Sequence, residues 1–169
     1  MIASVILAHP YEGSFNHALC RAVLDTCSRL RMEVFAHDLY AEEFDPVLTK
    51  AELGKAPTTD ALVRRYAEEL VASDLLVFIH PNWWGQPPAI LKGHIDRVVR
   101  PPHAYDFPVG DSGGGLPIGR LSGKVAIVLN TSNTPPDREA AVFGDPLHLL
   151  WKNCIFDLCG TAEFHRRMF

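Results

Sequence analysis

The chain has 169 residues, a length that predicts a single domain over 1–169 with a sizeable core. Its apolar content of 47% is typical of globular proteins, and its net charge of −4 argues against nucleic acid as a main partner. No stretch is long and apolar enough to predict membrane insertion, and no basic leader with an apolar stretch follows Met1. We therefore expect a cytoplasmic protein.

The four cysteines are Cys20, Cys27, Cys154 and Cys159, and they form no C-x-x-C pair and match no zinc-binding spacing. We expect neither disulfides nor a metal site. Cys154 falls on an apolar stripe, so its expected role is core packing. The eight histidines are scattered, with no i, i+4 pair beside a carboxylate.

The chain opens with an apolar run, Ile2 to Ala8, which predicts a buried strand, and Phe15 to Leu30 shows the period of a helix. The polar turn between them contains His9, Ser14 and Asn16. A helix start offers free N–H groups that suit a phosphate. An ordinary helix start capped by Ser14 is the alternative. The turn matches neither of the glycine patterns typical of ATP or dinucleotide binding.

Strand and helix patterns continue to alternate. Strands are predicted over 32–37, 75–80 and 124–130, with an edge strand over 161–165, and helices over 58–73, 89–99 and from Asp145-Pro146 to a cap at Gly160. The last helix is expected to bury Leu147, Leu150, Trp151, Cys154 and Leu158. Segment 38–57 is predicted as a connection with short helical turns, and 101–123 as an excursion loop. Alternation predicts an α/β fold, a flavodoxin-like doubly wound five-stranded parallel sheet with helices on both faces.

Three loops are then expected at the carboxyl edge of the sheet, where such folds bind ligands. The second loop contains Trp83 and Trp84, which suit stacking on a ring ligand, although core packing beneath the loop is an alternative. The third loop, 130–136, consists of turn-forming residues that can also satisfy only themselves. We find no nucleophile motif and no carboxylate pair, which favours chemistry carried by a cofactor.

The chain resembles the flavodoxin-like NAD(P)H:quinone oxidoreductases. The resemblance rests on motifs that run through nearly the whole chain in the right order, and the most specific is the Ser-Phe-Asn turn combined with Pro-Ala-Ile-Leu-Lys-Gly. The matching residues are Ala8-His9-Pro10, Ser14-Phe15-Asn16-His17-Ala18-Leu19, Asp38-Leu39-Tyr40, Phe44-Asp45-Pro46, Pro81, Trp84, Pro88-Ala89-Ile90-Leu91-Lys92-Gly93, Asp96-Arg97-Val98, Ala104-Tyr105, Gly144-Asp145, Trp151 and Cys159-Gly160.

This resemblance implies a flavin, FMN or FAD, in a homodimer, and a ping-pong transfer of hydride from NADH or NADPH to a quinone-like acceptor. It assigns His9, Ser14, Phe15 and Asn16 to the flavin phosphate region. It assigns Pro81, Asn82, Trp83, Trp84 and Gly85 to the isoalloxazine ring, with Thr131, Ser132 and Asn133 as third-loop contacts. Tyr105 and Phe107 would reach a substrate pocket shared across the dimer.

The third loop departs from the family pattern. It has no Gly-Gly pair, no Tyr lies between this loop and Asp145, and Phe143 stands where the family has a His. Charge on a reduced flavin would then be stabilised by loop amides or Arg138. The chain ends at Phe169, without the extension of the mammalian enzyme, which favours FMN over FAD.

Three other functions stay open. One is a redox-sensing regulatory subunit of a cation transporter, with a membrane transporter as partner. Another is a one-electron carrier of the flavodoxin type, although the chain lacks the Ser/Thr-Gly-rich phosphate loop and the strongly acidic face of such carriers. The third is a scaffold that has lost flavin.

Overall fold

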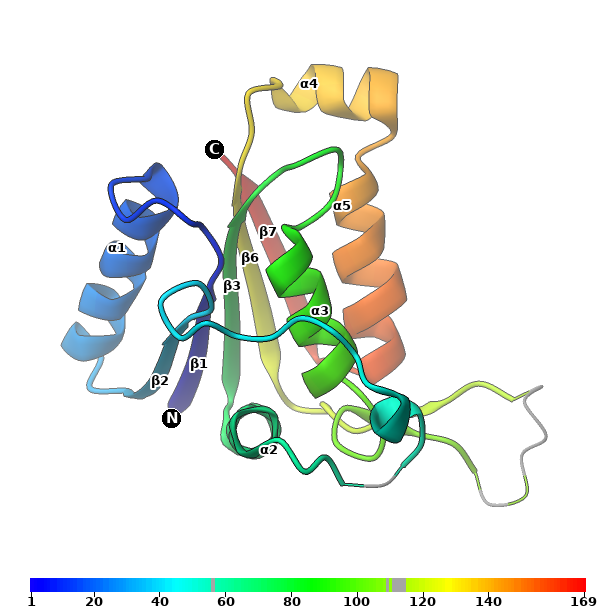
Figure 1. The fold of residues 1–169 in the computed structure, drawn as a ribbon. Coiled ribbons are helices and arrows are strands. Elements are labelled where there is room, and N and C mark those ends of the chain that lie inside the picture. Colours follow the sequence, from blue (N-terminus) through cyan, green and yellow to red (C-terminus); the bar gives the residue numbers. More distant parts are fainter. Residues whose placement is uncertain (56, 109, 111–114) are drawn as a thin grey trace.

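The computed structural model describes residues 1–55, 57–108, 110 and 115–169. Its main sheet has five parallel strands in the order β2-β1-β3-β6-β7 (Figure 1). These strands are β1 (Ile2–Leu7), β2 (Glu33–Asp38), β3 (Leu75–Pro81), β6 (Val125–Thr131) and β7 (Glu163–Met168). The order reverses direction between β1 and β3, as in a doubly wound flavodoxin-like sheet. The predicted fold class is confirmed.

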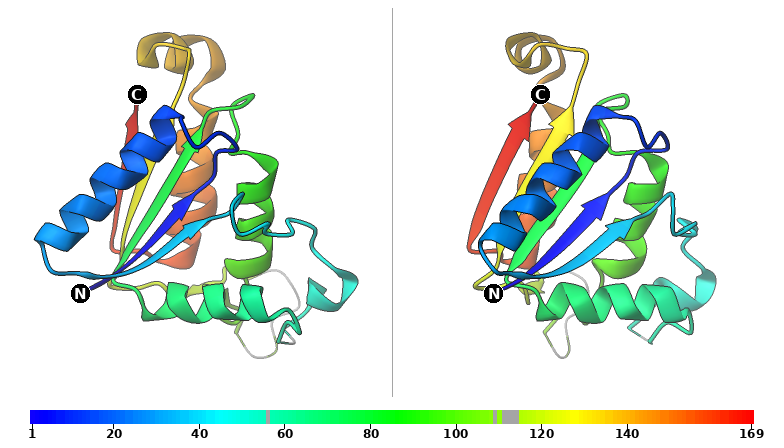
Figure 2. Two further views of the ribbon diagram at one scale, coloured as in Figure 1. Left: turned by 60° about the vertical axis from the view of Figure 1, so that its left-hand side comes forward. Right: turned by 90° about the vertical axis from the view of Figure 1, so that its left-hand side faces the viewer.

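Helices cover both faces of this sheet. Figure 2 shows α1 (Phe15–Arg29) lying across one face of the sheet. The helices that pack against the other face are α2 (Ala61–Ala72), α3 (Ala89–Val98) and the helix formed by α5 (Pro146–His148) and η3 (Leu149–Asp157). Alternate strand residues point to opposite faces, so Val5 and Val77 pack towards α1, whereas Ile6 and Phe78 join the larger core.

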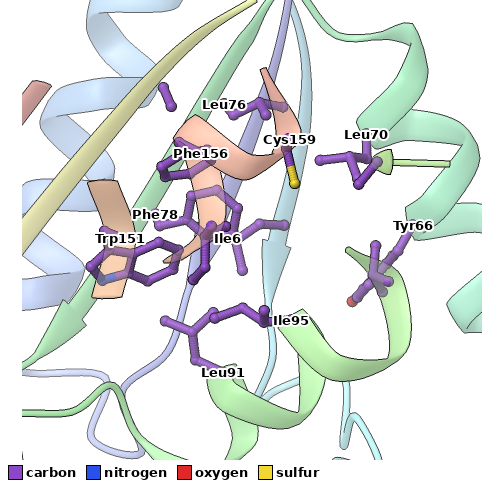
Figure 3. Close-up of a cluster of buried hydrophobic side chains, with 14 of the residues drawn as sticks. Ile6, Tyr66, Leu70, Leu76, Phe78, Leu91, Ile95, Trp151, Phe156 and Cys159 are labelled. Carbon is purple, nitrogen blue, oxygen red and sulfur yellow. The ribbon is translucent and has the colours of Figure 1, made fainter. Parts of the chain in front are cut away.

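The larger core is built around aromatic rings (Figure 3). Trp151 and Phe156 are almost completely buried, and their ring centroids lie 4.9 and 5.9 Å from that of Phe78. Each large aromatic buries enough apolar surface to contribute a few kcal/mol, about 25 cal/mol per Å². This core anchors the last helix to the sheet.

The last helix differs from its predicted buried face. Leu147 and Trp151 are buried as expected, but Cys154 is exposed and Leu158 is 38% exposed. Their places in the core are taken by Ile155, Phe156 and Cys159. The cause is the π-helical geometry of η3, whose wider turn shifts the buried positions away from the spacing of an α-helix. The prediction for Cys154 is wrong for this reason.

Two connections contain structure of their own. The 38–57 connection includes the short 3₁₀ helix η1 (Lys50–Leu53), as predicted. The excursion loop forms a small antiparallel pair, β4 (Tyr105–Asp106) and β5 (Ile118–Gly119), and part of it lies outside the described residues. After β6, a short helix that the sequence reading missed runs through α4 (Pro136–Arg138) and η2 (Glu139–Phe143).

All four cysteines are free thiols. Within the described part of the chain there is no group of His, Cys, Asp or Glu side chains placed to hold a metal ion. The described helices include none with the length and hydropathy needed to cross a membrane.

Candidate functional site

Three loops meet at one edge of the sheet because the neighbouring strands β1, β3 and β6 run parallel and end together (Figure 1). The backbone hydrogen bonds between neighbouring strands continue into the first residues of the loops. The Ala8 N–H donates to the Ile79 carbonyl at 2.9 Å, and the Asn82 N–H donates to the Thr131 carbonyl at 2.7 Å. The sequence prediction that these loops share one edge is therefore confirmed, and their backbones are fixed where they leave the sheet.

The first loop begins helix α1 with a side-chain cap. The Ser14 Oγ accepts the His17 N–H at 3.2 Å and lies 2.9 Å from His17 Nδ1. His17 Nε2 lies 3.1 Å from an Asp38 carboxylate oxygen. Ser14 thus has the capping role that the sequence left open as an alternative. The N–H groups of Phe15 and Asn16 find no acceptor among the described residues, so the start of α1 keeps two donors free.

Asn16 ties the first loop to the third. Its side chain is 2% exposed, and its Nδ2 donates to the Thr131 Oγ1 at 3.0 Å. Its Oδ1 is buried without a hydrogen-bond partner in the described structure. His9 connects the first loop to the second, because its ring centroid lies 6.2 Å from that of Trp83. The three loops therefore form one connected unit.

The second loop contains a tight turn that places both tryptophans outside the core. Trp83 and Gln86 exchange two backbone hydrogen bonds of 3.0 Å, and the central residues Trp84 and Gly85 have φ values of 58° and 72°. Positive φ at both positions defines a type I′ turn. Trp84 is fully exposed and Trp83 is 42% exposed, so packing beneath the loop, the alternative considered from the sequence, is wrong.

Gly85 is required in this turn for two reasons. Its left-handed backbone disfavours a side chain, and an added Cβ would lie 2.6 Å from Cγ of Pro146. Asn82 fixes the turn from within, since its Oδ1 accepts the Gly85 N–H at 2.9 Å. Its Nδ2 donates to Glu139 Oε1 at 3.0 Å. Pro81, the last residue of β3, is buried in the sheet opposite Thr131.

The second and third loops enclose a cleft of about 470 Å³, a volume within the range of small-molecule sites. Its predicted lining residues are Asn82, Trp84, Gly85, Ser132 and Asn133, and those missed from the sequence are Thr134, Glu139, Phe143 and Pro146. Most of the missed residues belong to or flank the unpredicted helix after β6. The signal for that helix was Pro135-Pro136 followed by acidic residues and alanines, with Pro at its first position.

Arg166, on β7, holds the third loop in place through hydrogen bonds to Asn130 and Asp145. Its side chain is 6% exposed, and its Nη1 donates to both carboxylate oxygens of Asp145 at 2.7 Å. Its Nε donates to the Oδ1 of Asn130, which is completely buried, at 2.8 Å. Arg138, the cation proposed from the sequence, is exposed and is not a lining residue of the cleft. The buried guanidinium therefore holds the loop.

The N–H of Asn133 finds no acceptor in the described part of the chain. By contrast, the Ser132 N–H donates to the Phe169 carbonyl at 2.9 Å, and the Thr134 N–H donates to the Ser132 Oγ at 3.1 Å. The third loop thus satisfies part of its own polar groups and leaves a donor for another molecule.

Tyr105 and Phe107 lie apart from this cleft. They line a separate cavity of about 320 Å³ beside segment 48–55 and the end of α3, and their ring centroids are 5.8 Å apart. Within one chain, the structure does not bring them to the three loops. Their assignment to a shared substrate pocket stays a prediction.

Three titratable groups with shifted pKa values, His80, Cys20 and Cys159, do not supply a nucleophile. His80 is completely buried, accepts a hydrogen bond of 3.1 Å from the Trp151 indole N–H, and lies 2.8 Å from the Pro81 carbonyl through Nδ1. Burial lowers its pKa to about 4, so the ring is neutral near pH 7. Burial also raises the pKa values of Cys20 and Cys159 to about 11. Both thiols therefore stay protonated and unreactive.

Comparisons with known proteins agree with this geometry. Residues 1–166 match a protein family described by its flavodoxin-like fold. The chain is 30% identical over 168 residues to an NAD(P)H oxidoreductase of Haemophilus influenzae, described as uncharacterized, covering 98% of this chain and 81% of that protein. It is also 30% identical to ribosyldihydronicotinamide dehydrogenase [quinone] of Pongo abelii, covering 87% of this chain and 71% of the relative.

Solved structures show the same fold. A Streptococcus mutans protein has a TM-score of 0.85 at 32% identity, covering 100% of this chain and 87% of the other. An FMN-dependent NADH-azoreductase of Bacillus anthracis, solved in complex with FMN, has a TM-score of 0.75 at 16% identity, covering 99% and 86%. The fold, the loop arrangement and these matches lead to one conclusion: the chain belongs to the flavodoxin-like NAD(P)H:quinone oxidoreductase family.

Proposed function

We propose that this protein binds FMN at the edge formed by the three loops and transfers hydride from NADH or NADPH to a quinone-like acceptor by a ping-pong route. The observation that carries the proposal is the linked arrangement of these loops, which combines free donors at the start of α1 with a cleft, between the second and third loops, walled by Trp84 and Phe143. The quinone reductase among the relatives supports the same reaction class.

The donor set of the first loop fits a phosphate group. The N–H groups of Phe15 and Asn16 have no acceptor among the described residues, and they lie at the positive end of the dipole of α1. The Ser14 hydroxyl caps the helix while remaining next to these groups. We propose that a phosphate monoester binds here, which FMN carries at its end.

The second and third loops fit the edge and face of a planar ring. Trp84 and Phe143 provide apolar surface, whereas the Asn133 N–H provides a free donor. The buried Nδ2 of Asn130 and Oδ1 of Asn16 have no hydrogen-bond partners in the described structure, and both belong to the loop framework around this edge. Such polar atoms are rare in native proteins and mark places where another molecule or a water completes the structure.

A bound flavin would supply the hydride chemistry that no described side chain of the cleft can perform. The protein's part is to hold the reactants. Arg166 and Asn82 fix the third and second loops, and the turn around Gly85 keeps its backbone close to Pro146. Fixed loops preserve the contact geometry between hydride donor and acceptor, on which the rate depends.

The nicotinamide and the acceptor would use the cleft in turn, since its volume suits one ring ligand above a cofactor. We propose a homodimer in which Tyr105 and Phe107 of one copy close the pocket of the other, because within a single chain they line a different cavity.

The proposal is tested by comparing the binding of riboflavin, FMN and FAD to the purified protein by equilibrium dialysis. Charge-assisted hydrogen bonds from the start of α1 should make FMN bind about tenfold or more tightly than riboflavin. FAD should bind no more tightly than FMN. Equal affinity for riboflavin and FMN would refute the proposed phosphate-binding site at the start of α1. If none of the three flavins binds, the proposed function is overturned.

A further inference from the structure

Glu139 places a carboxylate in the wall of the cleft. The residue begins η2, directly after α4, and its side chain lines the cleft while the residue as a whole is 3% exposed. Its Oε1 accepts one hydrogen bond, of 3.0 Å, from Asn82 Nδ2. Its Oε2 has no hydrogen-bond partner among the described residues, and it is not one of the fully buried unpaired atoms. This second oxygen is therefore open to the contents of the cleft.

The charge on Glu139 has no cationic partner within the described part of the chain. None of the ion pairs among the described residues includes it, and Arg166 is committed to Asp145 and Asn130. The other residues that line the cleft carry no charge: Asn82, Trp84, Gly85, Ser132, Asn133, Thr134, Phe143 and Pro146. The cleft thus presents one ionisable group, and that group is negative when ionised.

We propose that Glu139 makes the cleft selective for uncharged acceptors and disfavours anionic ones. The inference rests on the proposed function, in which an acceptor enters this cleft. A carboxylate in a partly enclosed site repels another anion more strongly than it would in water, because the surrounding protein screens the charge less. A neutral quinone meets the same walls without this penalty, so the charge separates two acceptors of similar shape.

The same carboxylate also holds Asn82, which fixes the Trp84 turn, so its charge must be tested separately from its hydrogen bond. Glu139→Gln keeps an oxygen acceptor for Asn82 and removes the charge. Asp137→Asn is the matched control, because Asp137 is exposed on the same short helix and does not line the cleft. Both variants change the net charge of the protein by the same amount.

The experiment measures dissociation constants for menadione and for a naphthoquinone sulfonate, using protein loaded with FMN and without NAD(P)H. Quenching of tryptophan fluorescence follows binding, and Trp84 lines the cleft. We expect Glu139→Gln to tighten binding of the sulfonate by about five- to tenfold, the order expected for one partly screened charge. Menadione binding should change by less than about twofold, and Asp137→Asn should leave the ratio unchanged.

Equal changes for both ligands would overturn the inference and assign Glu139 a purely structural role, and so would no change for either. If Glu139→Gln does not fold, salt dependence in the wild type decides the question. Raising the ionic strength should lower the ratio of the sulfonate dissociation constant to the menadione dissociation constant. A ratio that does not change with ionic strength would contradict the inference. Failure of the protein to bind FMN would overturn the proposed function. The dissociation constants of menadione and the naphthoquinone sulfonate, measured on FMN-free protein, would still test the effect of the Glu139 charge.

Discussion

Replacing Arg166 by methionine should destabilise the protein and loosen the third loop. The guanidinium makes two contacts of 2.7 Å with Asp145 and one of 2.8 Å with Asn130, and its side chain is 6% exposed. Methionine fills much of the same volume but offers no donor. The variant therefore removes the hydrogen bonds while keeping most of the packing.

The magnitude follows from what each partner loses. Asn130 is completely buried, so leaving its Oδ1 unsatisfied should cost about 1–3 kcal/mol. The Asp145 carboxylate is 33% exposed, and water can partly replace the guanidinium. Its loss should therefore add about 1 kcal/mol, less than the cost of a fully buried orphaned charge. We expect the free energy of unfolding to fall by about 3 kcal/mol in total.

The assay is urea unfolding at pH 7, followed by tryptophan fluorescence and by far-ultraviolet circular dichroism. Arg167→Met is the control, because Arg167 is exposed on the same strand and its guanidinium lies 5.5 Å from the centre of the Phe169 ring. That contact is worth about 0.5–1 kcal/mol at an exposed site. If the two variants lose the same stability, or if Arg166→Met loses less than about 1 kcal/mol, the role given to Arg166 is refuted.

Three further predictions concern the core and the cofactor site. Burial alone would raise the pKa of Glu52, but hydrogen bonds led by Arg97 outweigh it and lower the pKa from 4.5 to about 2. Because the folded pKa is the lower one, this stabilisation is complete above about pH 4.5 and is lost as the pH falls towards 2. It should amount to about 3 kcal/mol, and Glu52→Gln should flatten the acid limb of a stability–pH curve, whereas an unchanged limb would contradict this. Combining Ser14→Ala with Asn16→Ala should weaken FMN binding about tenfold or more in dialysis, and unchanged affinity would remove the phosphate site. Trp84→Ala should alter the visible spectrum of bound flavin or speed its loss without changing the melting temperature, since the side chain is fully exposed, and a lower melting temperature with an unchanged spectrum would contradict its place at the ring.

The sequence predicted the sheet because its buried strands are short and apolar. Leu75 to His80 is a nearly continuous apolar run, and the structure buries it between two layers of helices. The cap formed by Ser14, which the sequence offered as an alternative to a phosphate contact, follows from its place before an amphipathic run. These features depend on local patterns, which a single sequence displays directly.

The missed features depend on tertiary context. Cys154 was placed in the core by an α-helical period, and the wider turn of η3 moved it to the surface. Glu139 follows two prolines in a segment for which the sequence analysis predicted no element, and no local pattern shows that its carboxylate meets Asn82. Arg166 gave no signal at all, because its partners Asn130 and Asp145 come from segments that only the fold brings together.

The most direct test of the account is anaerobic titration of the FMN-loaded protein with NADH and with NADPH, monitored by the visible absorbance of the flavin, followed by addition of menadione. We predict that at least one nicotinamide bleaches the flavin and that menadione restores its absorbance, which are the two half-reactions of a ping-pong reductase. Bound flavin that neither nicotinamide reduces would contradict the central claim and favour a one-electron carrier or a redox-sensing subunit.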